Sequence, residues 1–168
     1  MHLYKIDSTN VKNMPIDSKD VFDLKVFTPS LHGFFLKGER AGIKMLFIRL
    51  MFQVMTLGKA QIYYVQSGNY IMHTSYVVPA CFKFPFMNRY DLEIGPCYTY
   101  PDFRGKGIYP KVLSEICRRR SDCVLSFYMI VDETNIPSIK GIEKAGFVRC
   151  GSVKKSKFSK RYKLVVEK

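Results

Sequence analysis

The sequence has few acidic residues for its length. It contains 14 Asp and Glu against 27 Lys and Arg, which gives a formal net charge of +13 and a pI near 9.6. This balance favours anionic partners, and it is compatible with nucleic acid, an anionic membrane surface or a phosphorylated ligand. Charge alone does not choose among these three.

Histidine and cysteine are too scattered to indicate a metal centre or a disulfide framework. The three histidines show no metal-ligand spacing. The five cysteines are odd in number and form no Cys-x-x-Cys pair: Cys81, Cys97, Cys117, Cys123 and Cys150. Isolated cysteines of this kind are typical of a reducing compartment, so we predict a cytoplasmic protein without a bound metal.

Long hydrophobic runs are also missing. The most apolar stretch, residues 43–57, is shorter than the roughly 20 residues that span a membrane, and it contains Lys44. The polar N-terminus indicates no signal peptide. Because Arg49, Gln53 and Thr56 share one helical face, we predict a helix over residues 39–57 that packs on a sheet. Peripheral contact with a membrane surface is the alternative for this helix.

The remaining pattern predicts one α/β domain over residues 1–168, with an irregular lead-in (1–38) and a core (39–168). Within the lead-in, residues 3–6 are compatible with a first strand. In the core, strands are predicted at 60–66, 70–78, 92–99, 123–131, 147–153 and 162–166, and further helices at 107–119 and 136–144. This order of elements indicates a mixed, mostly antiparallel sheet flanked by helices.

A glycine-bearing turn at residues 104–107 joins the predicted strand 92–99 to the helix that follows it. Arg104, Gly105, Lys106 and Gly107 form this turn. The first N–H groups of a helix have no partner within it, the helix dipole is positive there, and glycine lets a ligand approach the backbone. The turn therefore indicates a phosphate cradle. A tight turn without a ligand is the plain structural alternative.

Two motifs together resemble the GNAT (Gcn5-related N-acetyltransferase) superfamily. Arg104-Gly105-Lys106-Gly107-Ile108 is similar to its acetyl-CoA motif, Gln/Arg-x-x-Gly-x-Gly/Ala. About 30 residues downstream, the stretch from Asn135 to Phe147 is similar to its Asn-x-x-(Ala/Ser)…Glu-Lys-x-Gly-Phe pattern. The resemblance implies the GNAT fold, acetyl-CoA as cosubstrate, and transfer of the acetyl group to a small-molecule amine.

Three further stretches resemble GNAT enzymes from bacterial surface-polysaccharide gene clusters: residues 58–64, Phe84-Pro85-Phe86 and Ile94-Gly95-Pro96-Cys97. This narrower resemblance implies an amino sugar, free or linked to a nucleotide, as the acceptor.

The family resemblance also implies the cofactor-binding residues. The pantetheine arm of CoA would pair with the backbone of the 92–99 strand, and the turn would hold the pyrophosphate through its backbone N–H groups. Asn135 and Ser138 would contact the arm from the other side, although these two residues are equally suited to capping a helix. The implied set is Cys97, Tyr98, Thr99, Arg104, Gly105, Lys106, Gly107, Ile108, Tyr109, Asn135 and Ser138.

Two positions depart from the family pattern. Tyr109 stands where the first motif ends in a small residue, so its side chain must point away from the pyrophosphate or its hydroxyl must join the site. Ile142 stands where many members carry the tyrosine that protonates the departing thiolate. The usual general acid is therefore missing from its usual position.

The candidates for proton transfer follow from strand alternation and intrinsic pKa. Glu93 shares a strand face with Cys97 if the alternation holds through Gly95-Pro96, and it is one candidate base. His73 is the other, since its intrinsic pKa is better suited, although a lone histidine in an apolar strand is more often structural. Tyr98 is a candidate acid, as are Tyr100 and Tyr109.

Two rival functions remain. Residues 149–168 hold eight basic residues interleaved with Phe158 and Tyr162, which favours a nucleic-acid-binding module. A solvated edge hairpin protected by lysines is the plain reading of the same stretch, and we expect nucleic acid not to be a partner. The second rival, suggested by Ile142, is a GNAT fold that binds CoA without turnover.

Overall fold

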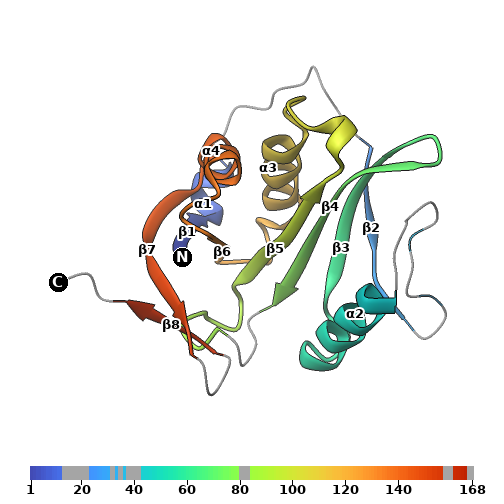
Figure 1. Cartoon of the computed structure of the whole chain (residues 1–168). Helices are drawn as coiled ribbons and strands as arrows, with labels where there is room; N and C mark the ends of the chain where they lie inside the picture. The colour runs from blue at the N-terminus through green and yellow to red at the C-terminus, as the bar shows by residue number, and fades with distance from the viewer. Residues whose placement is uncertain are drawn as a thin grey trace.

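The computed structural model describes residues 1–12, 23–30, 33, 36, 43–79, 84–156 and 161–165. It shows a mixed sheet of eight strands in the order β2-β3-β4-β5-β6-β1-β7-β8 (Figure 1). The strands are β1 (His2–Asp7), β2 (Leu24–Phe27), β3 (Gln61–Ser67), β4 (Tyr70–Pro79), β5 (Leu92–Thr99), β6 (Ser126–Val131), β7 (Val148–Lys155) and β8 (Tyr162–Val165). The helices are α1 (Ser8–Lys12), α2 (Ile43–Met55), α3 (Ile108–Arg120) and α4 (Ile136–Lys144), with a 3-10 turn at Pro101–Phe103.

The predicted α/β class is confirmed. Neighbouring strands pair antiparallel except β5 and β6, which are parallel. Helix α4 spans the residues that the sequence pattern predicts, because Asn135 caps its first turn and Pro137 stands near its start. Gly107, with a φ of 69°, begins α3 in the left-handed conformation that glycine adopts without strain.

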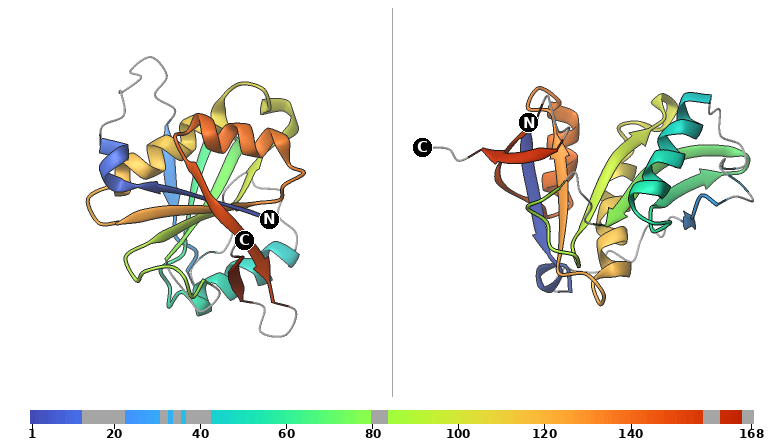
Figure 2. Two further views of the ribbon diagram at one scale, coloured as in Figure 1. Left: turned by 90° about the vertical axis from the view of Figure 1, so that its left-hand side faces the viewer. Right: turned by 90° about the horizontal axis from the view of Figure 1, so that it is seen from below.

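The prediction of an irregular lead-in is wrong where the structure describes it. Strand β1 lies inside the sheet, antiparallel to both β6 and β7 (Figure 2), and it buries Leu3, Tyr4 and Ile6. Strand β2 adds an edge to the sheet by pairing with β3. The alternation of apolar and polar residues in β1 is short and is followed by turn-forming residues. The strands that pair with β1 are distant in the sequence, so the local pattern does not predict them.

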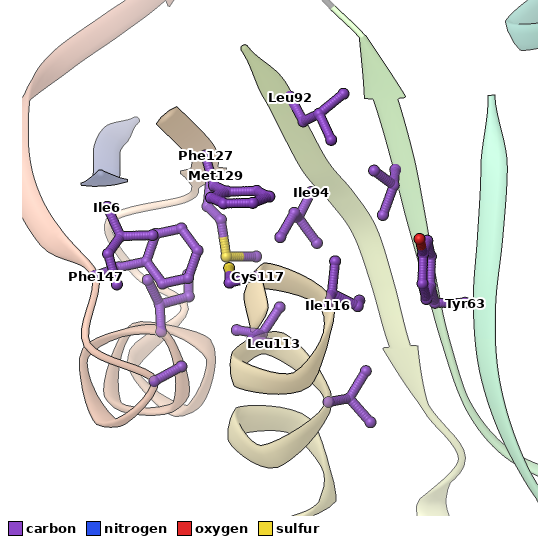
Figure 3. Close-up of a cluster of buried hydrophobic side chains, with 14 of the residues drawn as sticks. Ile6, Tyr63, Leu92, Ile94, Leu113, Ile116, Cys117, Phe127, Met129 and Phe147 are labelled. Atoms are coloured by element: carbon purple, nitrogen blue, oxygen red, sulfur yellow. The ribbon is translucent and has the colours of Figure 1, made fainter. Parts of the chain in front are cut away.

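The main core lies between the sheet and helices α3 and α4 (Figure 3). Leu113 and Ile116 of α3 are fully buried there, against Ile94 of β5 and Phe127 of β6. These contacts place the first turn of α3 beside the end of β5. The core therefore orients the glycine turn that joins the two elements.

Helix α2 packs on the sheet, as predicted. Its contacts with Ile62 and Tyr76 come through Met45 and Phe52, on the face of the sheet opposite Tyr63 and α3. Gly58 ends the helix with a φ of 79° and donates its N–H to the Gln53 carbonyl at 2.8 Å. Among the described helices, none is long and apolar enough to cross a membrane.

The basic C-terminal hairpin lies at the edge of the sheet. β8 is the outermost strand, and Tyr162 is not presented for base stacking, because its ring stacks on Phe84 with centroids 5.4 Å apart. Lys155 Nζ lies 5.9 Å from the centroid of the same ring. Phe158 lies outside the described residues, as do Cys81 and His32. The described part of the hairpin therefore fits the protected-edge reading.

Candidate functional site

Strands β5 and β6 diverge soon after they meet (Figure 1). They pair at Leu92 with Phe127 and at Glu93 with Tyr128, and no further pairing joins them in the described chain. The β4–β5 register shifts at the same level, between Ser75 and Val77. The later part of β5 therefore presents a backbone edge, and an elongated ligand can pair with this edge as an added strand would.

A pocket of about 690 Å³ lies at this opening. Three of its lining residues are cationic, Arg104, Lys140 and Lys144, and none is acidic. The others come from β4, β5, the glycine turn, α3 and α4: His73, Cys97, Tyr98, Thr99, Phe103, Gly105, Gly107, Ile108, Tyr109, Pro110, Asn135, Pro137, Ser138 and Gly141. Its charge suits an anion, and its volume suits part of an extended cosubstrate.

The backbone of the predicted cradle has the geometry of an anion-binding turn. Gly105 and Gly107 have φ values of 74° and 69°, and a Cβ added to either would point into open space. Both line the pocket at the N-terminus of α3, where the N–H groups of Ile108 and Tyr109 belong to the unpaired first turn. Left-handed glycines beside a helix N-terminus form an anion-binding concavity, so the residues fit a pyrophosphate.

Helix α4 faces this turn across the pocket. Asn135 Oδ1 accepts a hydrogen bond from the Ser138 backbone N–H at 3.3 Å, and both residues line the pocket. The capping role expected as an alternative is thus confirmed. It leaves the Ser138 hydroxyl and the Asn135 amide group beside the pocket, so capping and ligand contact are compatible.

His73, in the wall of the pocket, belongs to a chain of hydrogen-bonded side chains. Its Nδ1 lies 2.7 Å from Thr99 Oγ1 and its Nε2 lies 2.7 Å from Ser75 Oγ, while Ser75 Oγ donates to Cys97 Sγ at 3.2 Å. The side chain is 0% exposed, and desolvation lowers its pKa to about 4. His73 is therefore neutral at pH 7 with both nitrogens engaged, which is the structural role rather than that of a base.

The burial of His73 predicts an acid-sensitive fold. Its pKa is about 4 when folded and 6.5 when unfolded, so between these values only the unfolded state gains this proton. The stabilisation is complete above pH 6.5 and is lost as the pH falls toward 4, by about 3 kcal/mol. Urea denaturation at pH 7 and pH 4 measures it. The His73→Gln variant should lose about 3 kcal/mol less than the wild type over this range, and equal losses would contradict the assignment.

Tyr109 points inward. Its hydroxyl is hydrogen-bonded to Cys97, and its ring centroid lies 5.7 Å from that of His73. The ring fills a notch at Gly141 of α4, where an added Cβ would lie 2.5 Å from Tyr109 Cδ1. Burial, reinforced by Cys97, raises the pKa of this phenol, so it stays protonated. The side chain therefore points away from the glycine turn, and its hydroxyl lies beside Cys97, another residue of the pocket lining.

Cys97 is not a nucleophile in this arrangement. Burial of the sulfur raises the pKa of the thiol to about 12, despite hydrogen bonds with Ser75 and Tyr109 that lower it. A thiolate is the reactive form of cysteine, and it is negligible at neutral pH with such a pKa. The sulfur instead connects the His73 chain to Tyr109.

The predicted side chains of the turn have mixed placements. Arg104 donates from Nε to the Thr99 carbonyl at 3.0 Å, and its guanidinium lies over Tyr98, 5.6 Å from the ring centroid. Tyr98 lines the pocket but is 48% exposed. Lys106 lies over Phe103 and is not among the residues that line the pocket. The turn therefore contributes backbone and Arg104 to the pocket, but not the Lys106 side chain.

Glu93 lies outside the pocket, and its expected common face with Cys97 is wrong. Leu92 and Ile94, its neighbours in β5, face the α3 side, and Cys97 packs against the same core. Glu93 faces the opposite side, where its charge acts on Tyr162. The irregularity at Gly95 and Pro96 changes the alternation of β5 between Glu93 and Cys97. The role of Glu93 as a base therefore stays a prediction, and Glu93 would act on the face of the sheet opposite the pocket.

Ile142 occupies the position of the usual acid as a core residue. It is 1% exposed and packs in the core cluster that contains Phe147 and Leu113. A tyrosine hydroxyl is therefore replaced there by an apolar contact. The neighbouring Glu143 accepts a hydrogen bond from the Tyr4 hydroxyl of β1 at 2.9 Å, which fixes α4 to the sheet.

Several lining residues were not foreseen. Phe103, Pro110, Pro137, Gly141 and Lys144 line the pocket without having been singled out for it. Lys144 belongs to the Glu-Lys pattern in the sequence. Its position in the last turn of α4 does not by itself predict that it lines the pocket. Gly141 gives a signal only when paired with Tyr109, since glycine within a helix lowers its stability unless a neighbour needs the space.

Solved structures of GNAT acetyltransferases resemble this fold. An acetyltransferase of the GNAT family from Colwellia psychrerythraea has a TM-score of 0.62 at 14% identity, over 89% of this chain and 52% of its own. A GCN5-related N-acetyltransferase from Sphaerobacter thermophilus has a TM-score of 0.55 at 12% identity, over 88% and 47%. A tandem GNAT protein from the clavulanic acid biosynthesis pathway has a TM-score of 0.55 at 16% identity, over 88% and 49%.

The fold defined by the sheet and the pocket is thus the GNAT fold. The chain spans about half the length of these structures. No protein-family model matches the sequence, and no curated protein matches it. In the described residues, no group of three or more His, Cys, Asp or Glu is arranged to hold a metal ion.

Proposed function

We propose that the protein transfers an acetyl group from acetyl-CoA to a primary amine of a small molecule. The supporting observation is the position of the cationic pocket, where the free edge of β5 leads to the left-handed glycines at the start of α3. An edge strand pairs with amide groups, and the helix start binds phosphate, which matches the two parts of CoA in order. The bound cosubstrate supplies the activated acetyl thioester.

The protein's own groups divide into binding and polarising roles. Backbone N–H groups from Gly105 to Tyr109 bind the pyrophosphate, and Lys140 and Lys144 add positive charge from α4. The backbone of residues 97–99 orients the arm, and an N–H group there stabilises the negative charge that develops on the thioester oxygen. Asn135 and Ser138 limit the pocket on the side of α4.

Tyr109 is proposed as the hydrogen-bond donor to the departing thiolate, since Ile142 stands at the position of the usual tyrosine. Tyr109 lines the pocket, its hydroxyl is hydrogen-bonded to Cys97, and a raised pKa keeps the phenol protonated. When the bond between sulfur and the acetyl carbon breaks, the phenol donates a hydrogen bond to the departing thiolate, because its raised pKa opposes full transfer of the proton to sulfur. Glu93 faces the opposite side of the sheet from the pocket, and no carboxylate lines the pocket among the described residues, so the amine proton is proposed to leave to solvent.

The acceptor is proposed to be an amino sugar, free or linked to a nucleotide. The net charge of +13 favours an anionic acceptor over a polyamine, and the stretches at 58–64, 84–86 and 94–97 support a sugar. A nucleotide-linked amino sugar is both anionic and a sugar, so it meets both criteria. The proposal places the reaction in a cytoplasmic setting, where such sugars and acetyl-CoA are both present.

Release of CoA thiol tests this function. Acetyl-CoA is incubated with the protein and with nucleotide-linked amino sugars, free amino sugars, amines and peptides, and free thiol is followed by a colorimetric reagent. We expect thiol release that requires an amine and yields the N-acetyl product by mass spectrometry. Binding of acetyl-CoA by calorimetry without turnover on any acceptor would favour the binding-only fold that Ile142 suggests.

A further inference from the structure

Helix α2 differs from an ordinary surface helix, because polar side chains on one side of it face the protein and apolar side chains on the other side face solvent. Arg49 is 1% exposed and donates from Nε to the Tyr76 hydroxyl at 3.0 Å. Gln53 donates from Nε2 to the Ala60 carbonyl at 3.0 Å, and Thr56 Oγ1 accepts from the Ala60 N–H at 3.0 Å. These bonds tie one face of the helix to the sheet and its adjoining loop, so the orientation is fixed.

The opposite side of α2 carries an apolar stripe that faces solvent. Its six residues, here named the α2 stripe, are Ile43, Phe47, Leu50, Met51, Val54 and Leu57, which are 73%, 62%, 43%, 41%, 68% and 87% exposed. The first five follow helical spacing, and Leu57 continues the stripe just past the last turn. A contiguous exposed apolar patch of this kind marks an interaction surface.

The charged residues in the stretch that carries the stripe are all cationic. Lys44 within the helix and Lys59 just after it are exposed. No acidic residue occurs in the sequence between Glu39 and Asp91, a stretch that includes α2, β3 and β4. An apolar stripe flanked in the sequence by Lys44 and Lys59 complements an anionic lipid surface, which offers acyl chains beneath negative headgroups.

A second copy of the chain is the less suitable occupant. A helix of 13 residues is roughly 20 Å long, so its outer face covers roughly 200 Å², well below the roughly 800 Å² that each partner buries in a stable interface. Two chains of net charge +13 would also repel. A lipid surface needs no such area, because it adapts to the protruding side chains.

We infer that the α2 stripe docks the protein on anionic membrane surfaces, with α2 lying along the interface. The helix is too short to span a bilayer, so the contact is peripheral. This inference is independent of the proposed acetyl transfer, because the pocket lies on the α3 side of the sheet and α2 on the other. Membrane binding and catalysis are thus expected to fail separately on substitution.

Vesicle sedimentation tests the inference with the whole protein. We expect binding to phosphatidylcholine vesicles that contain about 30% phosphatidylglycerol, at least about tenfold tighter than to phosphatidylcholine alone and weakened by salt. The double variant Phe47→Glu/Val54→Glu should bind at least about tenfold more weakly than the wild type. Leu125→Glu/Val148→Glu changes charge equally at residues that are 54% and 69% exposed elsewhere, and it should bind much more tightly than the α2 variant.

A tryptophan reporter supplies a readout that does not depend on disruptive substitutions. The chain contains no Trp, so Phe47→Trp introduces a unique fluorophore into the stripe. Its emission should shift to the blue when anionic vesicles are added, whereas that of Leu125→Trp should not. Equal behaviour of the two reporters, or equal weakening by the two double variants, overturns the inference. A dimer of the wild type that separates in Phe47→Glu/Val54→Glu, without vesicle binding, would assign the stripe to a second copy instead.

Discussion

Replacement of Gly107 by glutamate should abolish measurable acetyl-CoA binding, with the dissociation constant raised at least about 100-fold. Gly107 has a φ of 69° at the start of α3, where a side chain would enter the open space at the pocket. The substitution places a negative charge where the helix dipole and first-turn N–H groups attract an anion, and it strains a left-handed position by about 1–2 kcal/mol. Titration calorimetry with acetyl-CoA measures the effect.

The matched control for this experiment is Gly68→Glu. Gly68 lies in the β3–β4 turn with a φ of 57° and also has open space at its Cβ position, so strain and charge change are alike. We expect this variant to bind acetyl-CoA about as tightly as the wild type. Far-UV circular dichroism and thermal unfolding establish that both variants are folded. If a folded Gly107→Glu protein keeps wild-type affinity, the cradle does not bind the cosubstrate.

Replacement of Tyr109 by phenylalanine should lower kcat by about 100-fold and leave acetyl-CoA binding nearly unchanged. The ring still fills the notch at Gly141, so the packing between α3 and α4 is kept. Only the hydroxyl that bonds to Cys97 is removed. Removal of one hydrogen-bond donor to a developing negative charge costs about 10²–10³-fold in kcat, which sets the size of the effect. Steady-state thiol release and calorimetry measure the two quantities separately.

Two further variants isolate the role of that hydroxyl. Tyr63→Phe removes a phenol from a residue that is 3% exposed in the same core but does not line the pocket, and it should retain wild-type kcat. Cys97→Ala removes the partner of the Tyr109 hydroxyl and should reduce kcat less than Tyr109→Phe does. Wild-type turnover in Tyr109→Phe would instead give Tyr109 a packing role alone.

The predictable parts of this fold are those with local signals. Asn135 and Pro137 determine where α4 begins, and the positive φ of Gly68 determines the β3–β4 turn. The order of the two motifs identified the GNAT fold, and Gly105, Gly107, Asn135 and Ser138 do meet at one pocket. In each case neighbouring residues carry the information, because capping and turn geometry depend on the chain within a few positions.

The parts that could not be predicted depend on contacts between distant residues. The partners of β1 are β6 and β7, over 100 residues away, and nothing within residues 2–7 specifies them. The side of the sheet on which Glu93 lies relative to Cys97 depends on the irregularity at Gly95-Pro96. The sequence of these two residues does not reveal how the alternation of side chains changes across them. The direction of Tyr109 was open until Gly141 was seen to leave room for it. The orientation of α2 likewise depends on Tyr76 and Ala60 as partners for its polar side chains.

The position of β1 also has a consequence for the order in which the protein can fold. Helix α4, which forms one wall of the pocket, is carried by the half of the sheet made of β6, β1 and β7. Its central strand, β1, precedes β6 and β7 by over 100 residues, so β1 is synthesised long before the strands that cover its edges. Pairings of such long sequence separation slow folding. The pocket is thus a late-forming feature, complete only when β1 has paired with β6 and β7.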